Sequence, residues 1–207
     1  MPPIAKLAKN AQRQLLDEIN YLNTREIKTF CRRHGIPYKI MIETAGGRHA
    51  LAGEDDRKGV ILERIRHFLR TGVVLGATRF PASVIARGPA PTHPIATDRL
   101  LYGHYDKTSD AMITLLQGLT NDRFRNGAVA RILAREFWAR GEAPTFKEFA
   151  SAWLRAERQH TKPNPEWAFL SDRASGNADP NWKRKRAAIA RRVLAVLDDI
   201  EPGRARR

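Results

Sequence analysis

The chain has 207 residues, enough for one or two small domains with a real hydrophobic core. Its 37 Lys and Arg residues outnumber its 22 Asp and Glu residues and give a formal charge of +15 at pH 7. A single cysteine excludes an intramolecular disulfide, and no apolar run approaches the roughly 18 residues that a membrane span needs. We therefore expect a cytoplasmic protein whose partners are polyanions and not membranes.

Positive charge is concentrated toward the two ends of the sequence. Residues 1–90 hold 16 basic and 8 acidic residues (+8), residues 91–160 hold 10 and 8 (+2), and residues 161–207 hold 11 and 6 (+5). Such a charge attracts nucleic acid, the commonest large polyanion, although an Arg-rich surface that serves only solubility has the same composition. Charge alone favours a nucleic-acid partner without identifying the surface that contacts it.

The segment 1–72 opens with an amphipathic pattern. Apolar residues at Ile4, Leu7, Leu15 and Ile19 follow a helical spacing. Acidic residues follow the basic ones in this stretch, which favours a helix that packs against the protein over a membrane-surface helix or an organellar presequence.

Two further helices are predicted in this segment, from Asn23 to Gly35 and from near Arg57 to Gly72. Asn23 can cap the first of them, and Glu26 can return a hydrogen bond to it as in a capping box. Each helix has its apolar residues on one side and a glycine at its end. The inward residues of the two helices are expected to be Ile27, Phe30, Cys31, His34, Ile61, Ile65, Phe68 and Leu69.

These two helices resemble the halves of a SAP domain, a small helix–loop–helix module that binds DNA. Residues 24–37, Thr-Arg-Glu-Ile-Lys-Thr-Phe-Cys-Arg-Arg-His-Gly-Ile-Pro, resemble the first half. Residues 58–65, Lys-Gly-Val-Ile-Leu-Glu-Arg-Ile, resemble the second half. The resemblance implies DNA binding by this module, in which the segment between the halves is much longer than the family's usual connecting loop.

The inserted residues 40–56 are expected to form an extended loop between the two helices. Within it, Ile40–Thr44 has the pattern of a short strand, and Gly46 and Gly47 have that of a turn. Residues 73–95 are rich in Gly and Pro and cannot hold a long helix, so we interpret them as a linker or an irregular packed crossing.

Residues 96–160 are predicted to form a bundle of three helices. Apolar residues within 112–119 and 124–138 follow helical periods, and Gly141 closes the second helix. Residues 145–148, Thr-Phe-Lys-Glu, form a capping box that begins the third. The region resembles the helical domain of unknown function that follows SAP-like segments in some bacterial proteins. The residues that carry this resemblance are Phe124-Arg125-Asn126 and the passage from Phe137-Trp138 to Trp153.

The C-terminal part of the chain divides into a loop and a helix. Residues 161–180, with several Pro, Asn and Ser residues, are interpreted as a loop that Trp167 and Phe169 anchor. Residues 181–207 begin with a basic helix that turns Val193 and Leu197 inward, and its short tail is expected to be disordered.

Cationic side chains in two regions are candidate phosphate contacts. In the SAP-like module, three of them lie on one side of a helix, and others flank the start of the next. At the start of the C-terminal helix, positive side chains interact unfavourably with the helix dipole, and a bound anion would offset this cost. Trp182 is available there for stacking on a base. The alternative in both places is a solvated basic face, with Trp182 packed inward. The candidate nucleic-acid-binding residues are Arg25, Lys28, Arg32, Arg33, Lys39, Arg57, Lys58, Arg64, Lys183, Arg184, Lys185 and Arg186.

A metal or acid–base site has little support, because the candidate residues show no metal-ligand spacing and scattered surface residues explain them better. His49 lies near the acidic residues 54–56, which are expected to neutralise the neighbouring basic helices. The sequence holds no serine-nucleophile motif and no dinucleotide fingerprint. The best candidates for such a site are His93, Asp98, His104, Asp106, Asp110 and Glu136.

The sequence thus predicts a mainly α protein: an N-terminal helix–extended loop–helix module, then a small helical bundle, then a basic C-terminal helix. The leading hypothesis is a non-enzymatic bacterial or phage-type protein that binds double-stranded DNA through its phosphates, with little sequence specificity and no cofactor. The bundle would provide a protein contact, self-association or further nucleic-acid surface. A nucleic-acid-processing enzyme and a protein–protein adaptor with incidental charge are the alternatives.

Overall fold

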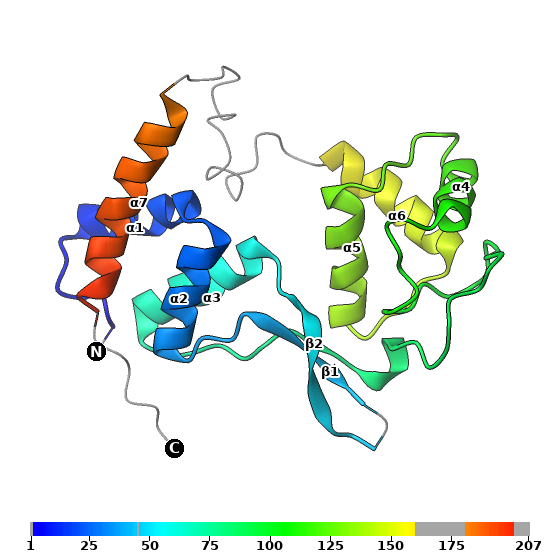
Figure 1. The fold of residues 1–207 in the computed structure, drawn as a ribbon, viewed down its shortest axis with the longest axis horizontal. Helices are drawn as coiled ribbons and strands as arrows, with labels where there is room; N and C mark the ends of the chain where they lie inside the picture. The colour runs from blue at the N-terminus through cyan, green and yellow to red at the C-terminus, as the bar shows by residue number, and fades with distance from the viewer. Residues whose placement is uncertain (1, 45, 160–180, 201–207) are drawn as a thin grey trace. The chain divides into compact units, whose positions relative to one another are not determined.

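The computed structural model describes residues 2–44, 46–159 and 181–200 (Figure 1). The chain divides into two compact units, and each unit is assembled from separate stretches of sequence around its own hydrophobic core. Unit 1 comprises Met1–Tyr38, Asp55–Ala77 and Thr161–Arg207, and unit 2 comprises Lys39–Glu54 and Thr78–His160.

Unit 1 is helical in its described part. Its second helix begins with the capping box expected from the sequence: the Asn23 side chain accepts a hydrogen bond from the Glu26 N–H (2.9 Å), and the Glu26 carboxylate accepts one from the Asn23 N–H (2.7 Å). Gly35 ends this helix in the left-handed conformation, with φ of 66°. The elements of unit 1 are α1 (Lys9–Glu18), the 3₁₀ turn η1 (Ile19–Tyr21), α2 (Thr24–His34), α3 (Lys58–Thr71) and α7 (Trp182–Asp198).

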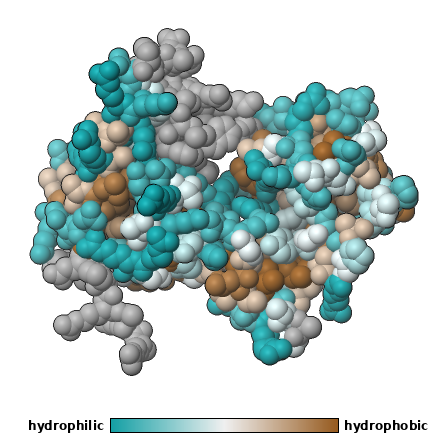
Figure 2. Space-filling view, in the orientation of Figure 1, coloured by the Kyte–Doolittle hydropathy of each residue, from teal (hydrophilic) through white to brown (hydrophobic). Residues whose placement is uncertain are grey.

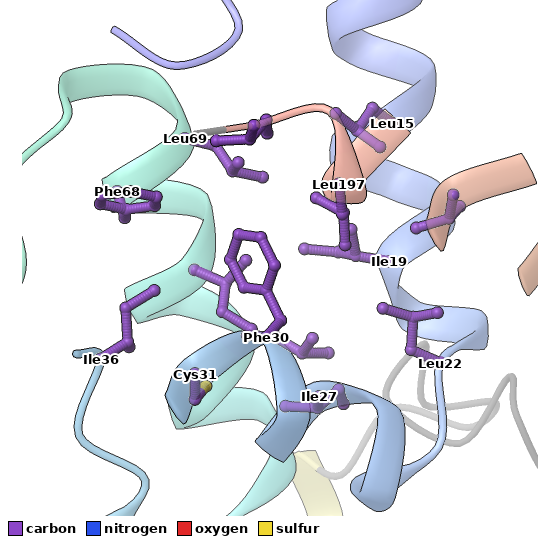
Figure 3. Packing of buried hydrophobic residues seen from close by; sticks show 14 of the residues in the cluster. Leu15, Ile19, Leu22, Ile27, Phe30, Cys31, Ile36, Phe68, Leu69 and Leu197 are labelled. Atoms are coloured by element: carbon purple, nitrogen blue, oxygen red, sulfur yellow. The ribbon is translucent and has the colours of Figure 1, made fainter. Parts of the chain in front are cut away.

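The apolar stripes predicted on α2 and α3 meet in the core of unit 1. All eight residues expected to point inward from these two helices are buried. Figure 3 shows Phe30 surrounded by aliphatic side chains from α1, η1, α3 and α7. Burial also raises the pKa of the Cys31 thiol to about 12, although the positive charges of Arg64 and Arg32 act to lower it. This cysteine is therefore a neutral core residue.

Helix α7 belongs to this core although it lies more than a hundred residues from α3 in the sequence. Its residues Ala190, Val193 and Leu197, and Ile200 just beyond its end, are buried in the same cluster as Leu15 of α1. The helix packs against α1 and η1. The basic C-terminal helix is therefore a structural part of the N-terminal unit.

Unit 2 contains a small mixed sheet that the sequence did not predict. The strands β1 (Lys39–Glu43) and β2 (His49–Asp55) form a hairpin that closes with a hydrogen bond from the Thr44 N–H to the Arg48 carbonyl (2.7 Å). The strand β3 (Arg79–Phe80) pairs parallel with β1, in the order β2-β1-β3. Most of the inserted segment 40–56 thus forms a hairpin of unit 2 and not an extended loop, and its last two residues belong to unit 1.

Three helices complete unit 2, and they are the three that the sequence predicted between residues 96 and 160. The expected capping box begins the last of them, where the Glu148 N–H donates to Thr145 Oγ1 (3.2 Å) and the Thr145 N–H donates to the Glu148 carboxylate (2.7 Å). Trp138 and Phe149 anchor an aromatic core against the inner face of the sheet, through Phe80. The helices are α4 (Asp110–Leu119), α5 (Ala128–Ala139) and α6 (Phe146–Gln159).

The prediction of a mainly α protein is wrong. Of the residues that the structure describes, 53% lie in helices and 10% in strands, and the sheet makes the fold α+β. The helical stretches were recognisable because each has a full amphipathic period. The sheet was missed because β2 (His-Ala-Leu-Ala-Gly-Glu-Asp) is rich in residues with low strand propensity, and β3 has only two residues. Both strands depend on tertiary contacts.

The expected linker, residues 73–95, is partly built into unit 2. Phe80 and Val84 are fully buried in its core, the latter in the 3₁₀ turn η2 (Ala82–Val84). Residues 73–77 instead belong to unit 1. The loop expected over 161–180, with Trp167 and Phe169, and the expected tail beyond residue 200 lie outside the described residues.

Candidate nucleic-acid interface

The outward face of α2 carries two exposed arginines. Arg25 and Arg32 lie two turns apart, on the side opposite the buried stripe. Thr29 lies between them, and Arg32 Nη2 donates a hydrogen bond to its Oγ1 (3.3 Å). Neither arginine forms an ion pair with any residue that the structure describes. A capped helix held by a packed core thus presents two guanidinium groups to solvent.

Two more cations flank this face, and each is held by an acid. Lys28 pairs with Asp55, and its Nζ lies 5.8 Å from the centre of the Tyr38 ring. Arg33 Nη1 lies 3.0 Å from a carboxylate oxygen of Asp198, and its Nη2 donates to the Asp198 carbonyl (2.7 Å). Ion pairs with this much solvent exposure contribute about 0–1 kcal/mol, so a phosphate can compete with the acid for either cation.

A shallow groove runs along the seam between α2 and α7. The two helices run in the same direction, because Glu26 near the start of α2 pairs with Arg186 near the start of α7, and Arg33 pairs with Asp198 at the other end. The groove has a volume of about 470 Å³, with an apolar floor and a polar rim. Its lining residues are Asn23, Arg25, Glu26, Thr29, Phe30, Arg33, Leu194, Leu197 and Asp198.

The structure removes Arg64 from the expected binding surface. This residue is only 5% exposed, and its guanidinium donates to the Asp56 carboxylate (2.8 Å) and to the Pro37 carbonyl (3.1 Å). The side chain holds the end of β2 and the chain after α2 against α3. Arg64 lies on the inward side of α3, because it is three residues after Ile61 and therefore shares the buried face of that helix.

The other cations expected around the start of α3 are half-buried. Lys58 Nζ donates a hydrogen bond to the Asn20 carbonyl (2.6 Å), so the expectation that this lysine is exposed is wrong. Arg57 is the residue before the first turn of α3 and is half-buried. Lys39 is on β1 and belongs to unit 2, whereas α2 belongs to unit 1.

The start of α7 divides the basic run into exposed and structural residues. Lys183, Arg184 and Lys185 are exposed. Arg186 instead turns toward η1 and α2, where it pairs with Glu26 and donates to the Tyr21 carbonyl (2.9 Å). Its expected contact with a phosphate is replaced by this internal one.

Trp182 is packed inward and is unavailable for stacking on a base. It is 8% exposed, and its ring lies 5.7 Å from the ring of Tyr21. Of the two alternatives left open for this residue, the structure has the packed one. The burial follows from the position of Trp182 at the start of a helix whose inner face closes the core of unit 1.

The acidic residues of the hairpin neutralise basic neighbours, as expected. Asp55 pairs with Lys28, and Asp56 pairs with Arg64, both within unit 1. Glu54 pairs with Arg135 of α5 in unit 2. Sequence reasoning did not identify Asp198 as a partner of the α2 surface, since nothing in the local pattern of α7 indicates which helix its C-terminal end contacts.

The candidate metal or acid–base residues have separate local roles. Asp98 accepts a hydrogen bond from the Ile95 N–H (2.9 Å), and His104 Nε2 lies 3.1 Å from the Gly88 carbonyl. Hydrogen bonds from the Thr108 N–H and hydroxyl lower the pKa of Asp106. Within residues 2–44, 46–159 and 181–200, no three His, Cys, Asp or Glu side chains gather in a way that could hold a metal ion. The remaining candidates are Asp110 in the first turn of α4, Glu136 on α5 and the exposed His93.

Comparison of the chain with protein families, with curated proteins and with solved structures finds no match. Within the part of the chain that the structure describes, no helix is long and apolar enough to cross a membrane.

Proposed function

We propose that this protein binds double-stranded DNA through the outward face of α2, without marked sequence preference. The observation that carries the proposal is the exposure of Arg25 and Arg32 on a helix that is capped at both ends and fixed by a buried core. Rigid cations at helical spacing suit phosphate groups, and neither residue forms an ion pair with an acid among the described residues.

Further cations of unit 1 extend this surface. Lys28 and Arg33 lie on either side of the outward stripe of α2 and would exchange Asp55 and Asp198 for phosphates. Lys183 and Arg184 are exposed at the start of α7, whose Arg186 contacts the start of α2. Phosphate-directed contacts of this kind position a protein on nucleic acid and carry no base specificity.

The compartment and the absence of turnover are part of the same proposal. The single cysteine and the large positive charge suit a cytoplasmic protein that associates with nucleic acid. We infer a binding role without chemistry, since the surface offers cations and no group placed for proton transfer.

Binding of labelled duplex DNA, single-stranded DNA and RNA across a salt series tests the proposal. Four to six phosphate contacts predict that log K falls with log salt at a slope of about −4 to −5 for the duplex. The duplex should bind more tightly than either single strand. No binding of any of the three at 50 mM salt would refute the proposal.

A pair of double variants tests the surface. Arg25→Ala/Arg32→Ala should weaken binding at least tenfold and make the salt slope less steep by about 2, because two phosphate contacts are lost. Arg13→Ala/Arg70→Ala removes the same charge from exposed positions on α1 and α3 and serves as the matched control. Equal effects of the two double variants would show that net charge, and not the α2 surface, governs binding.

A further inference from the structure

The strand β2 is an edge of the sheet in unit 2. In the order β2-β1-β3, its one neighbour among the described strands is β1. One side of its backbone therefore faces away from the sheet. An exposed edge of this kind offers unpaired N–H and C=O groups to another strand.

The side chains of β2 differ sharply between its two faces. Ala52 is 3% exposed and packs in the core of unit 2. Its neighbour Leu51 points to the other face and is 62% exposed, the largest exposure of any large apolar residue that the structure describes. Figure 2 shows apolar surface gathered over the β1–β2 hairpin, next to hydrophilic residues at its tip. The edge thus has an apolar centre.

Opposite charges stand at equal distances from Leu51 along the chain. Arg48 lies three residues before it, is exposed, and forms no ion pair with a described residue. Glu54 lies three residues after it, and its side chain remains 50% exposed although it pairs with Arg135. Arg48 is the residue before β2, and its carbonyl still pairs with the Thr44 N–H. Residues 48 and 54 are separated by an even number of positions, so in a strand continued by one residue their side chains project from the same face as Ala52, opposite to Leu51.

We propose that two copies of this chain associate by antiparallel pairing of their β2 edges about a twofold axis at Leu51. In this register Arg48 lies opposite Glu54 of the second copy, and the same contact recurs on the other side of the axis. His49 lies opposite Gly53, which leaves room for the imidazole. The two Leu51 side chains meet at the axis and cover each other's apolar surface. The edge is therefore complementary to itself in charge, size and hydrophobicity.

The small size of this contact sets the strength of the association. Pairing of about seven residues from each copy buries less surface than the roughly 1,200 Å² that stable complexes bury. The dimer is therefore weak and reversible, and we expect it between about 10 and 500 µM protein. The inference does not depend on the proposed nucleic-acid binding, because the paired residues 48–54 belong to unit 2 and the proposed DNA surface belongs to unit 1.

Sedimentation equilibrium of the full chain over this concentration range, without nucleic acid, tests the proposal. The wild-type protein should form dimers and no larger species, since a twofold contact closes on itself. Leu51→Lys should weaken the dimer at least tenfold by placing two ammonium groups at the axis. Val74→Lys, at an exposed apolar residue of unit 1, is the matched control and should leave the dimer unchanged.

Mixing two charge variants tests the register. In Arg48→Glu alone, and in Glu54→Arg alone, both contacts join like charges, and each dimer should weaken at least tenfold. An equimolar mixture should form heterodimers of near wild-type strength, because every contact then joins opposite charges. Circular dichroism of each variant verifies its fold.

Three outcomes would overturn the proposal. The first is a monomer at 500 µM, and the second is a dimer that Leu51→Lys leaves intact. The third is a mixture of correctly folded charge variants that associates no better than either variant alone. A wild-type protein that forms the dimer but binds no DNA would instead refute the proposed function and leave the inferred dimer intact.

Discussion

At the scale of the residue, Arg64 and Arg25 have the same side chain and opposite roles. Arg64 lies on the buried side of α3 and is closed off by Asp56 and the Pro37 carbonyl, whereas Arg25 lies on the outward side of α2 in water. Net charge counts both equally. Burial decides which of them a phosphate can reach.

The buried Arg64–Asp56 pair gives the first prediction. Arg64→Leu leaves the Asp56 carboxylate, whose side chain is 5% exposed, without its guanidinium. We expect a loss of about 3–5 kcal/mol of unfolding free energy, measured by urea denaturation. Arg64→Leu/Asp56→Leu should cost less than Arg64→Leu alone, since no uncompensated charge remains. A larger loss in the double variant would contradict this account.

His34 gives the second prediction. It is 6% exposed between Phe30 (4.2 Å between ring centres) and Phe68 (5.1 Å), and neither ring nitrogen has a hydrogen-bond partner among the described residues. Burial, together with the charge of Arg33, lowers its pKa below the ordinary 6.5. The unfolded chain therefore binds a proton more readily than the folded chain does. Stability from this group is complete above pH 6.5 and declines as the pH falls from 6.5 toward the lowered pKa.

His34→Leu should remove this part of the acid sensitivity and raise stability at pH 7 by about 1 kcal/mol, because a buried polar ring without partners is replaced by an apolar side chain. Thermal unfolding between pH 4.5 and pH 7.5 measures both effects. His67→Gln, at a half-buried histidine of α3, is the control. An unchanged pH profile in His34→Leu would disprove the role of this histidine.

At the scale of the element, α2 combines a buried face with the exposed face that we propose binds DNA. Its apolar stripe fills the core, and its start is fixed by Asn23 and Glu26. Glu26 also receives Arg186 of α7, so the same carboxylate caps one helix and holds another. The orientation of Arg25 and Arg32 depends on this anchoring.

The cap of α2 gives the third prediction. Asn23→Ala leaves the Glu26 N–H without its acceptor and should cost about 1 kcal/mol of unfolding free energy. Asn23→Ser keeps an acceptor and should recover most of the loss. Thermal denaturation followed by circular dichroism measures the three proteins. Equal stability of Asn23→Ala and the wild type would show that the cap contributes nothing.

At the scale of the whole molecule, each unit is assembled from distant parts of the chain. The hairpin inserted between α2 and α3 belongs to unit 2, and α7 returns from beyond residue 180 to complete unit 1. A boundary drawn along the sequence therefore cuts through both units. Neither the SAP-like segment nor the C-terminal helix is an independent module.

Removal of residues 181–207 gives the fourth prediction. Four residues of the unit 1 core cluster would be lost together with the buried Trp182, namely Ala190, Val193, Leu197 and Ile200. Their burial contributes roughly 5–10 kcal/mol, which is comparable to the whole stability of a domain. Unit 1 should unfold while unit 2 keeps its aromatic core.

The single cysteine reports this outcome. In the full chain Cys31 is buried and its thiol is protonated at neutral pH, so a thiol reagent should react slowly. In the truncated chain the reaction should be at least tenfold faster, and near-ultraviolet circular dichroism should retain a signal from Trp138 and Trp153 of unit 2. Slow labelling in the truncated chain would contradict the assignment of α7 to unit 1.

Local sequence patterns were sufficient to specify the helices and their inward faces. The capping boxes at Asn23 and Thr145 and the stripe through Ile27 and Phe30 are local signals, because hydrogen bonds and helical periods act within a few residues. From the same signals, the exposure of Arg25 and Arg32 was predictable. The exposed basic residues of the proposed surface were therefore partly identified without the structure.

The sheet, the membership of each unit and the neutralisation of particular cations follow instead from long-range packing. The strands β2 and β3 form because β1 pairs with them and Phe80 is buried, not because of their own propensity. Asp198 pairs with Arg33, which is 165 positions away in the sequence, and local patterns cannot indicate a partner at that separation. Local periodicity specifies what each helix buries, whereas long-range packing specifies what it is buried against and which charges remain in water.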